Sequence, residues 1–269
     1  MSMDTMSTVT VTVPLRYADP DQPAGIFYAG QHAASSASFR TVDTTITNAR
    51  PIASEFSLDV HGFALVKHQT AVRDFADEDE VKRVYTAELE ELVKGATGAV
   101  KVVVFHTMAR FEDGEKRGER QPARAAHADY DGPSFEVWIR RAMGAEADEW
   151  LAGRWSEINV WRGIRPVERV PLAVTDARTV GLDEYMSVPI HERPDEPQPF
   201  VGLNLMHDPK QRWYYFPDMQ PDEALLFRLW DTDPAVPFPV AHSAIDDPTS
   251  RPDAAPRASV EARTVAFFG

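Results

Sequence analysis

Short apolar segments separated by proline-containing turns dominate the second half of the chain, and this regular spacing limits the folds that the chain can adopt. The segments lie at 172–174, 200–204, 213–216, 224–227, 239–242 and 258–267. Proline cannot donate a hydrogen bond to a sheet ladder, so the 21 prolines suit turns and strand edges and not long helices. Many short strands at close spacing predict a mainly β fold, a sandwich or jelly roll with helices packed on the outside.

The first half of the chain predicts one long helix and two strands. Apolar residues between about 77 and 94 fall on one stripe of a helix, and Gly95 is a typical C-terminal stop. The alternating stretch 8–13 predicts an edge strand or one arm of a hairpin, and residues 99–105 predict a buried strand.

The middle of the chain is expected to hold a loop and two short helices. Residues 112–118, which are charged and contain glycine, predict an exposed loop. The helices are expected at roughly 134–143 and 146–153. Because no shift in composition marks a boundary, we expect a single domain over residues 1–269. Its N-terminal strands and long helix would occupy about 1–98, and its jelly-roll core about 99–269.

The composition excludes several classes of function. The chain contains no cysteine, which rules out thiolate nucleophiles and iron–sulfur clusters and leaves His, Asp and Glu as metal ligands. A formal net charge of −14 disfavours nucleic-acid binding, because affinity for phosphates depends on clustered Lys and Arg. No signal sequence is visible, and no apolar run approaches the roughly 20 residues that cross a bilayer. We therefore expect a cytoplasmic protein without a membrane segment; whether it forms a homo-oligomer stays open.

One His-x-Asp pair, His127 and Asp129, is the first candidate for chemistry. On a β-strand, positions two apart face the same side, so the imidazole and the carboxylate can bind neighbouring positions of one metal ion. A third ligand from a distant strand would complete a 2-His-1-carboxylate facial triad, which leaves three coordination positions open. Such a pair also arises by chance at a surface or in a turn, so it needs support from elsewhere in the chain.

The C-terminal segment supplies that support. His242 closes an apolar stretch, and after a proline-rich connection Arg257 and Ser259 begin another strand on one shared face. If the metal is Fe(II) and the co-substrate is 2-oxoglutarate, the remote carboxylate of 2-oxoglutarate needs a buried cation and a hydroxyl donor. Arginine suits this role because its planar guanidinium can donate two parallel hydrogen bonds to a carboxylate. Arg263, on the same nominal face, is the reserve candidate. The alternative for these arginines is an ordinary solvated edge strand.

The candidate residues occur in a fixed order with several other segments. These segments are 62–65, 97–99, 158–164, 171–178, 213–219, 222–227, Asp231 and 256–263. Over roughly residues 60–268 the order resembles the hydroxylase/desaturase family, which includes fungal gibberellin desaturase, AsaB-type enzymes and cephalosporin 7-alpha-methoxylase components. The resemblance implies a double-stranded β-helix of the cupin-like, jelly-roll type that depends on Fe(II) and 2-oxoglutarate. It also implies hydroxylation or desaturation of a small secondary metabolite, with decarboxylation of 2-oxoglutarate to succinate.

Four further residues in the matching segments are candidates for the same site. Asn159 and Trp161 share one face of a strand, where Asn159 is expected near the 1-carboxylate of 2-oxoglutarate and Trp161 in the substrate wall. The alternative is that this face of the strand is simply exposed to solvent. In the aromatic run 213–216, Trp213 and Tyr215 are expected to contact the substrate, because aromatic side chains often line small-molecule pockets.

Other classes of protein stay open at this point. A non-catalytic jelly-roll module, either ligand-binding or a partner subunit, would keep the strands but would need no carboxylate anchor one strand beyond a triad. A metal hydrolase would need a general base beside zinc, and the sequence offers no positioned candidate. His207, which precedes an Asp-Pro turn, is a weaker rival to His242 as third ligand. The aromatic content suggests a partly apolar natural product as substrate.

Overall fold

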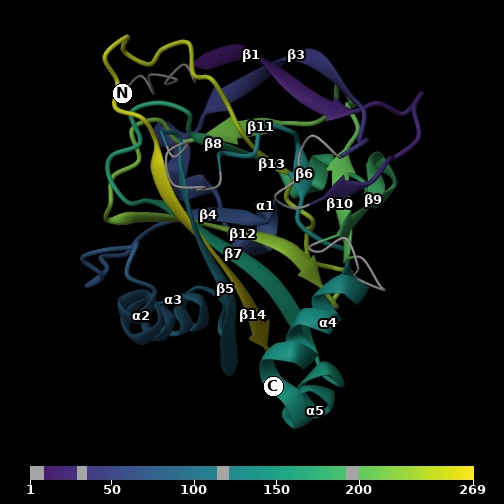
Figure 1. The fold of residues 1–269 in the computed structure, drawn as a ribbon, viewed down its shortest axis with the longest axis vertical. Helices are drawn as coiled ribbons and strands as arrows, with labels where there is room; N and C mark the ends of the chain where they lie inside the picture. The colour runs from purple at the N-terminus through teal and green to yellow at the C-terminus, as the bar shows by residue number, and fades with distance from the viewer. Residues whose placement is uncertain (1–8, 29–34, 114–120, 192–199) are drawn as a thin grey trace, which may run out of the picture.

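The computed structural model describes residues 9–28, 35–113, 121–191 and 200–269. Two β-sheets face each other, with α2 and α3 against the smaller sheet and with α4 and α5 near the C-terminal end of β14 (Figure 1). This arrangement confirms the expected mainly β jelly roll with flanking helices. None of the helices in the described residues is long and apolar enough to span a membrane.

The larger sheet has nine strands in the order β1-β3-β11-β8-β13-β6-β10-β9-β2. Their bounds are β1 Thr10–Ala18, β2 Phe27–Tyr28, β3 Phe39–Asn48, β6 His127–Ala128, β8 Leu172–Thr175, β9 Tyr185–His191, β10 Phe200–Leu205, β11 Trp213–Tyr215 and β13 His242–Ala244. The position of β1 at one edge confirms the edge strand predicted near the N-terminus. The predicted strand at 239–242 differs, because only His242 of that stretch is in a strand, and it begins β13.

The smaller sheet has five strands in the order β4-β12-β7-β14-β5. Their bounds are β4 Phe63–Lys67, β5 Lys101–Phe111, β7 Trp155–Gly163, β12 Glu223–Asp231 and β14 Ala258–Phe267. The N-terminal part of the chain contributes to both sheets, because β3 pairs with β11 and β4 pairs with β12.

The helices lie in the connections between strands. Their bounds are η2 Arg50–Glu55, α1 Leu58–His61, α2 Glu78–Glu80, η3 Val81–Tyr85, α3 Thr86–Thr97, α4 Gly132–Met143, η5 Gly144–Glu146, α5 Ala147–Leu151, η6 Ala177–Thr179 and η7 Leu182–Glu184. The predicted helices near 134–143 and 146–153 correspond to α4 and to η5 with α5. Most of the loop predicted at 112–118 lies outside the described residues.

The long helix near residues 77–94 is present, with a different end. It runs through α2, the π-helical turn η3 and α3, and the predicted stop at Gly95 lies inside α3. The chain leaves the helix at Gly98, whose φ of 74° is left-handed and whose N–H donates to the carbonyl of Lys94. A glycine without a left-handed backbone does not end a helix, which explains the error.

The two faces of β7 contact different parts of the protein. Ile158 and Val160 point outward into an apolar cluster that contains Leu89 and Val93 of α3. The alternate positions point inward to the larger sheet, and they include the buried polar side chain of Asn159. All nine residues of β7 are buried, so the alternative of a solvent-exposed face is wrong. Buried polar side chains, Glu157 and Asn159, therefore lie between the two sheets beside Trp155 and Trp161.

We expect Gly62→Ala to destabilise the protein more than Gly98→Ala. Both glycines have a left-handed backbone, which costs other residues about 1–2 kcal/mol. Nothing lies within 4 Å of a Cβ at Gly98, whereas one at Gly62 would lie 2.6 Å from Cγ2 of Val240. Such crowding should add about 1–3 kcal/mol. Urea denaturation gives both free energies of unfolding, and equal losses would contradict the packing described at Gly62.

Candidate metal centre

Two neighbouring strands of the larger sheet bring the predicted metal ligands together. His127 of β6 lies directly opposite His242 of β13, and the two ring centroids are 4.3 Å apart. Asp129 follows β6, with its Oδ1 3.8 Å from Nε2 of His127. One ligand atom from each of the three residues lies within 4.8 Å of the others. This spacing suits a single metal ion bound by two imidazoles and one carboxylate.

The orientation of both rings directs the same nitrogen to the centre. Nδ1 of His127 lies 2.8 Å from the carbonyl oxygen of Ala125, and Nδ1 of His242 lies 3.5 Å from that of Val240. A backbone carbonyl accepts from a protonated Nδ1, which leaves Nε2 of the neutral ring free to bind a metal. The local backbone on each strand therefore sets the ligand atom.

The carboxylate of Asp129 is held by residues of the smaller sheet. Asn159 on β7 donates from Nδ2 to Oδ2 over 2.7 Å. Arg263 on β14 donates to both oxygens, over 3.2 Å from Nε to Oδ2 and 2.9 Å from Nη2 to Oδ1. Burial alone would raise the pKa of Asp129, but the charge of Arg263 and the two neighbouring histidines hold it well below its usual range. Asp129 is therefore ionised and fixed in place.

Arg257, directly before β14, and Ser259, within it, are buried, and each has one donor atom without a partner. Nε of Arg257 and Oγ of Ser259 have no hydrogen-bond partner among the described residues. Nη1 of Arg257 donates to the carbonyl of Val170, and its guanidinium lies 5.4 Å from the ring centroid of Trp161. Burial, with a smaller effect of nearby Arg110, lowers the pKa of Arg257 to about 9. An anionic ligand would supply the missing acceptor, so these donors fit a carboxylate.

Arg263, the second candidate for binding the remote carboxylate of 2-oxoglutarate, is already surrounded by protein partners. Its third nitrogen, Nη1, lies 3.2 Å from the hydroxyl of Tyr130, so each of its nitrogens has a protein partner. The expectation that Arg263 could take the carboxylate of a co-substrate conflicts with these contacts. Of the two arginines, only Arg257 has a buried nitrogen without a hydrogen-bond partner among the described residues.

The aromatic run of β11 divides between the two faces of the larger sheet. Through β8, Tyr214 lies in the same cross-strand row as His242, so Tyr214 faces the metal side. Trp213 and Tyr215 point the other way, where Trp213 packs edge-on against Tyr17. Their predicted role in the substrate wall conflicts with this register.

Residues missed in the sequence lie beside the two histidines. The ring of Phe227 on β12 packs 4.8 Å from that of His242. On the other side, the cross-strand row continues from His127 to Asn204 of β10 and Met186 of β9, which are both half-buried. No local signal marks these positions, because strand pairing alone places them at the site.

His207, the weaker rival to His242, belongs to another part of the structure. Its ring packs edge-on against Tyr17 with centroids 5.1 Å apart. His207 is absent from the one cluster of metal-ligating side chains found in the described ranges.

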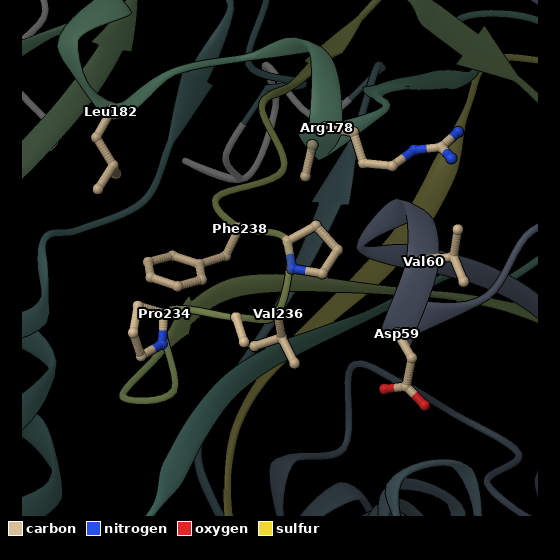
Figure 2. Close-up of a pocket in the computed structure, with 10 residues that line it drawn as sticks. Asp59, Val60, Arg178, Leu182, Pro234, Val236 and Phe238 are labelled. Atoms are coloured by element: carbon tan, nitrogen blue, oxygen red, sulfur yellow. The ribbon is translucent and has the colours of Figure 1, made fainter.

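The protein also has a surface groove, which is distinct from the metal cluster. Its volume is about 520 Å³, and its ten lining residues come from α1, η6, η7 and the segment 234–238. Figure 2 shows Leu182, Phe238, Val236 and Val60 around it. None of the three metal-ligating residues lines the groove.

We expect the metal-free protein to lose stability as the pH falls from about 6.5 toward 3. Burial, reinforced by neighbouring His127, lowers the pKa of His242 to about 3. The unfolded chain binds this proton near pH 6.5, so acid favours unfolding across that window. Urea denaturation between pH 7 and 4.5 should show a weaker pH dependence in His242→Gln than in the wild type. Parallel curves would contradict a neutral, buried His242.

Comparison with known proteins places this fold and site in one class. A family model described as "Oxidoreductase/YMDC permease-like domain" matches residues 15–267. The chain is 35% identical over 233 residues to the Fe(II)/2-oxoglutarate-dependent dioxygenase nvfI of Aspergillus novofumigatus, covering 82% of each protein. It is 33% identical over 254 residues to the hydroxylase/desaturase CTB9 of Cercospora beticola, covering 86% of this chain and 78% of that protein.

A solved structure shows the same fold over nearly the whole chain. The iron and alpha-ketoglutarate-dependent endoperoxidase NvfI matches with a TM-score of 0.87 and 27% identity, covering 98% of this chain and 99% of that one. The fold and site thus define a non-haem oxygenase. The chain belongs to the family of Fe(II)/2-oxoglutarate-dependent dioxygenases that includes the hydroxylase/desaturases. This membership favours an enzyme over a non-catalytic jelly-roll module.

Proposed function

We propose that His127, Asp129 and His242 bind Fe(II), and that Arg257 and Ser259 bind the remote carboxylate of 2-oxoglutarate. The observation that carries the proposal is the convergence of three ligands from segments far apart in the sequence. The unpartnered donors of Arg257 and Ser259 add a site for an anion on the neighbouring sheet.

The reaction that fits this site is oxidation of an unactivated C–H bond. Bound Fe(II), together with 2-oxoglutarate and O2, supplies the oxidising power, and 2-oxoglutarate is converted to succinate and CO2. The chain supplies ligands, orientation and a buried setting. Asp129 and Asn159 are both shielded from water, which strengthens every electrostatic contact at the centre.

The surroundings of Arg257 support its proposed contact with 2-oxoglutarate. The guanidinium of Arg257 lies over the ring of Trp161, and this contact limits the motion of the side chain. The carbonyl that accepts from Arg257 belongs to Val170, whose φ of 53° is rare for a β-branched residue. A strained residue of this kind persists only where its surroundings hold it, so the carbonyl that accepts from Arg257 is held in place. The contact of Asn159 with the 1-carboxylate of 2-oxoglutarate stays a prediction, and its amide nitrogen donates to Asp129.

The substrate is proposed to be a small, partly apolar natural product that is hydroxylated or desaturated. The names of the relatives, hydroxylase/desaturase CTB9 and dioxygenase nvfI, support this class of outcome. On the metal side of β11, Tyr214 and Phe56 pack with ring centroids 4.8 Å apart and provide apolar surface. The absence of cysteine supports work in the reducing cytoplasm. Light scattering on the purified protein will decide between a monomer and a homo-oligomer.

Succinate formation tests the proposed reaction directly. Wild-type protein and the Asp129→Ala variant are incubated with Fe(II), 2-oxoglutarate and air, and succinate is measured by mass spectrometry. We expect succinate above background from the wild type alone. Equal amounts from both proteins would contradict the proposed function. A product that gains one oxygen atom would indicate hydroxylation, and one that loses two hydrogen atoms would indicate desaturation.

A further inference from the structure

We propose that Arg263 is a positioning residue that makes Asp129 bind the metal through Oδ1 alone. The inference rests on the proposed function only in placing the metal at His127, Asp129 and His242. In this inference Arg263 holds the metal ligand Asp129, and Arg257 binds the co-substrate.

The two oxygens of Asp129 have unequal numbers of partners. Oδ2 accepts from Asn159 over 2.7 Å and from Nε of Arg263 over 3.2 Å. Oδ1 accepts only from Nη2 of Arg263, over 2.9 Å, and faces Nε2 of His127. A carboxylate oxygen offers about two lone pairs, so Oδ2 is fully used and Oδ1 keeps one for a metal. The hydrogen bonds therefore select a single binding atom.

Binding through one oxygen has a chemical consequence. A facial triad with a monodentate carboxylate fills three of six positions, whereas a bidentate carboxylate would fill four. The proposed co-substrate needs two of the open positions and O2 needs one. Because Oδ2 is occupied by Arg263 and Asn159, a metal bound to Oδ1 would keep its third position open.

The guanidinium of Arg263 is itself fixed from several sides. It is 7% exposed, lies 3.2 Å from the hydroxyl of Tyr130 and packs with its centre 5.0 Å from that ring. Glu261 lies 3.7 Å from Nη2. Tyr130 directly follows Asp129, so the end of β6 is tied to β14 through one side chain. Lysine could keep the charge at this position but not the two parallel bonds.

Titration with Co(II), in the absence of 2-oxoglutarate, tests the inference. We expect Arg263→Lys to raise the Co(II) dissociation constant about 10- to 100-fold, as substitutions of residues that hold metal ligands generally do. The visible ligand-field bands should also change in intensity, because they report the number of ligand atoms. Tyr130→Phe keeps both bonds to Asp129 and should show a smaller effect in the same direction. Arg257→Lys is the matched control, with Co(II) binding like that of the wild type.

Each outcome decides the inference. Wild-type Co(II) affinity and bands in Arg263→Lys, with a raised 2-oxoglutarate requirement, would make Arg263 the co-substrate anchor and overturn it. If Arg263→Lys does not fold, Asn159→Ala removes the other donor to Oδ2 of Asp129. An unchanged dissociation constant and spectrum in that variant would show that the partners of Oδ2 do not select the binding atom, and would overturn the inference. Wild-type protein that binds Co(II) but gives no signal with Fe(II) and 2-oxoglutarate would contradict the proposed function and leave this inference standing.

Discussion

His242→Ala is expected to abolish tight Fe(II) binding and, with it, all 2-oxoglutarate turnover. The ring is 3% exposed and lies directly opposite His127, so its loss leaves two of the three ligands found among the described residues. Because changes to the residues around ligands already cost about 10- to 100-fold in metal affinity, losing a ligand should cost more than that range. Anaerobic Fe(II) titration measures the dissociation constant.

The matched control for His242→Ala is His207→Ala. His207 is the rival histidine, and its ring contacts Tyr17, which is outside the metal cluster. His207→Ala should bind Fe(II) like the wild type. Equal losses in the two variants would show that removing a histidine destabilises the protein generally and would remove the support for His242 as a ligand.

Arg257→Gln is expected to weaken 2-oxoglutarate binding with little effect on Fe(II) binding. Removing one partner of a buried, hydrogen-bonded charge pair generally costs about 2–5 kcal/mol, or roughly 30- to several-thousand-fold in the dissociation constant. The expected loss is large because Arg257 is 1% exposed, so water cannot replace the side chain. The dissociation constant is measured by titrating 2-oxoglutarate into Fe(II)-loaded protein without oxygen.

Two variants define the role of Arg257 further. Arg257→Lys keeps the charge and loses the planar guanidinium. Its dissociation constant for 2-oxoglutarate should therefore lie between those of the wild type and Arg257→Gln. Ser259→Ala removes only one neutral donor and should cost about 0.5–1.5 kcal/mol. A wild-type dissociation constant in Arg257→Gln would contradict its role as the anchor.

The parts of the site that depend on one strand could be predicted from the sequence. His127 and Asp129 are two positions apart, and the structure places them on one side of β6. Arg257 and Ser259 follow the same rule at the start of β14. In each case one residue of the pair lies in a strand and the other lies in it or directly beside it, so the side-chain period of a strand was a sufficient guide.

The parts that depend on facing strands could not be predicted in this way. Arg263 shares its face with Arg257, yet its partner is Asp129, which comes from the opposite sheet. Trp213 and Tyr215 are both buried, so hydrophobicity alone does not reveal that their face of β11 points away from the metal. A sheet with two buried faces has no polar alternation to show which side is the inside.

The most direct test of the central claim is an anaerobic addition of Fe(II) and 2-oxoglutarate to metal-free protein, followed by visible absorption. If His127, Asp129 and His242 hold Fe(II) and leave open positions for a keto acid, a visible metal-to-ligand charge-transfer band will form with one equivalent of each. The band should be absent in His127→Ala and should need much more 2-oxoglutarate in Arg257→Gln. Folded, iron-loaded wild-type protein that gives no band at saturating 2-oxoglutarate would contradict the account.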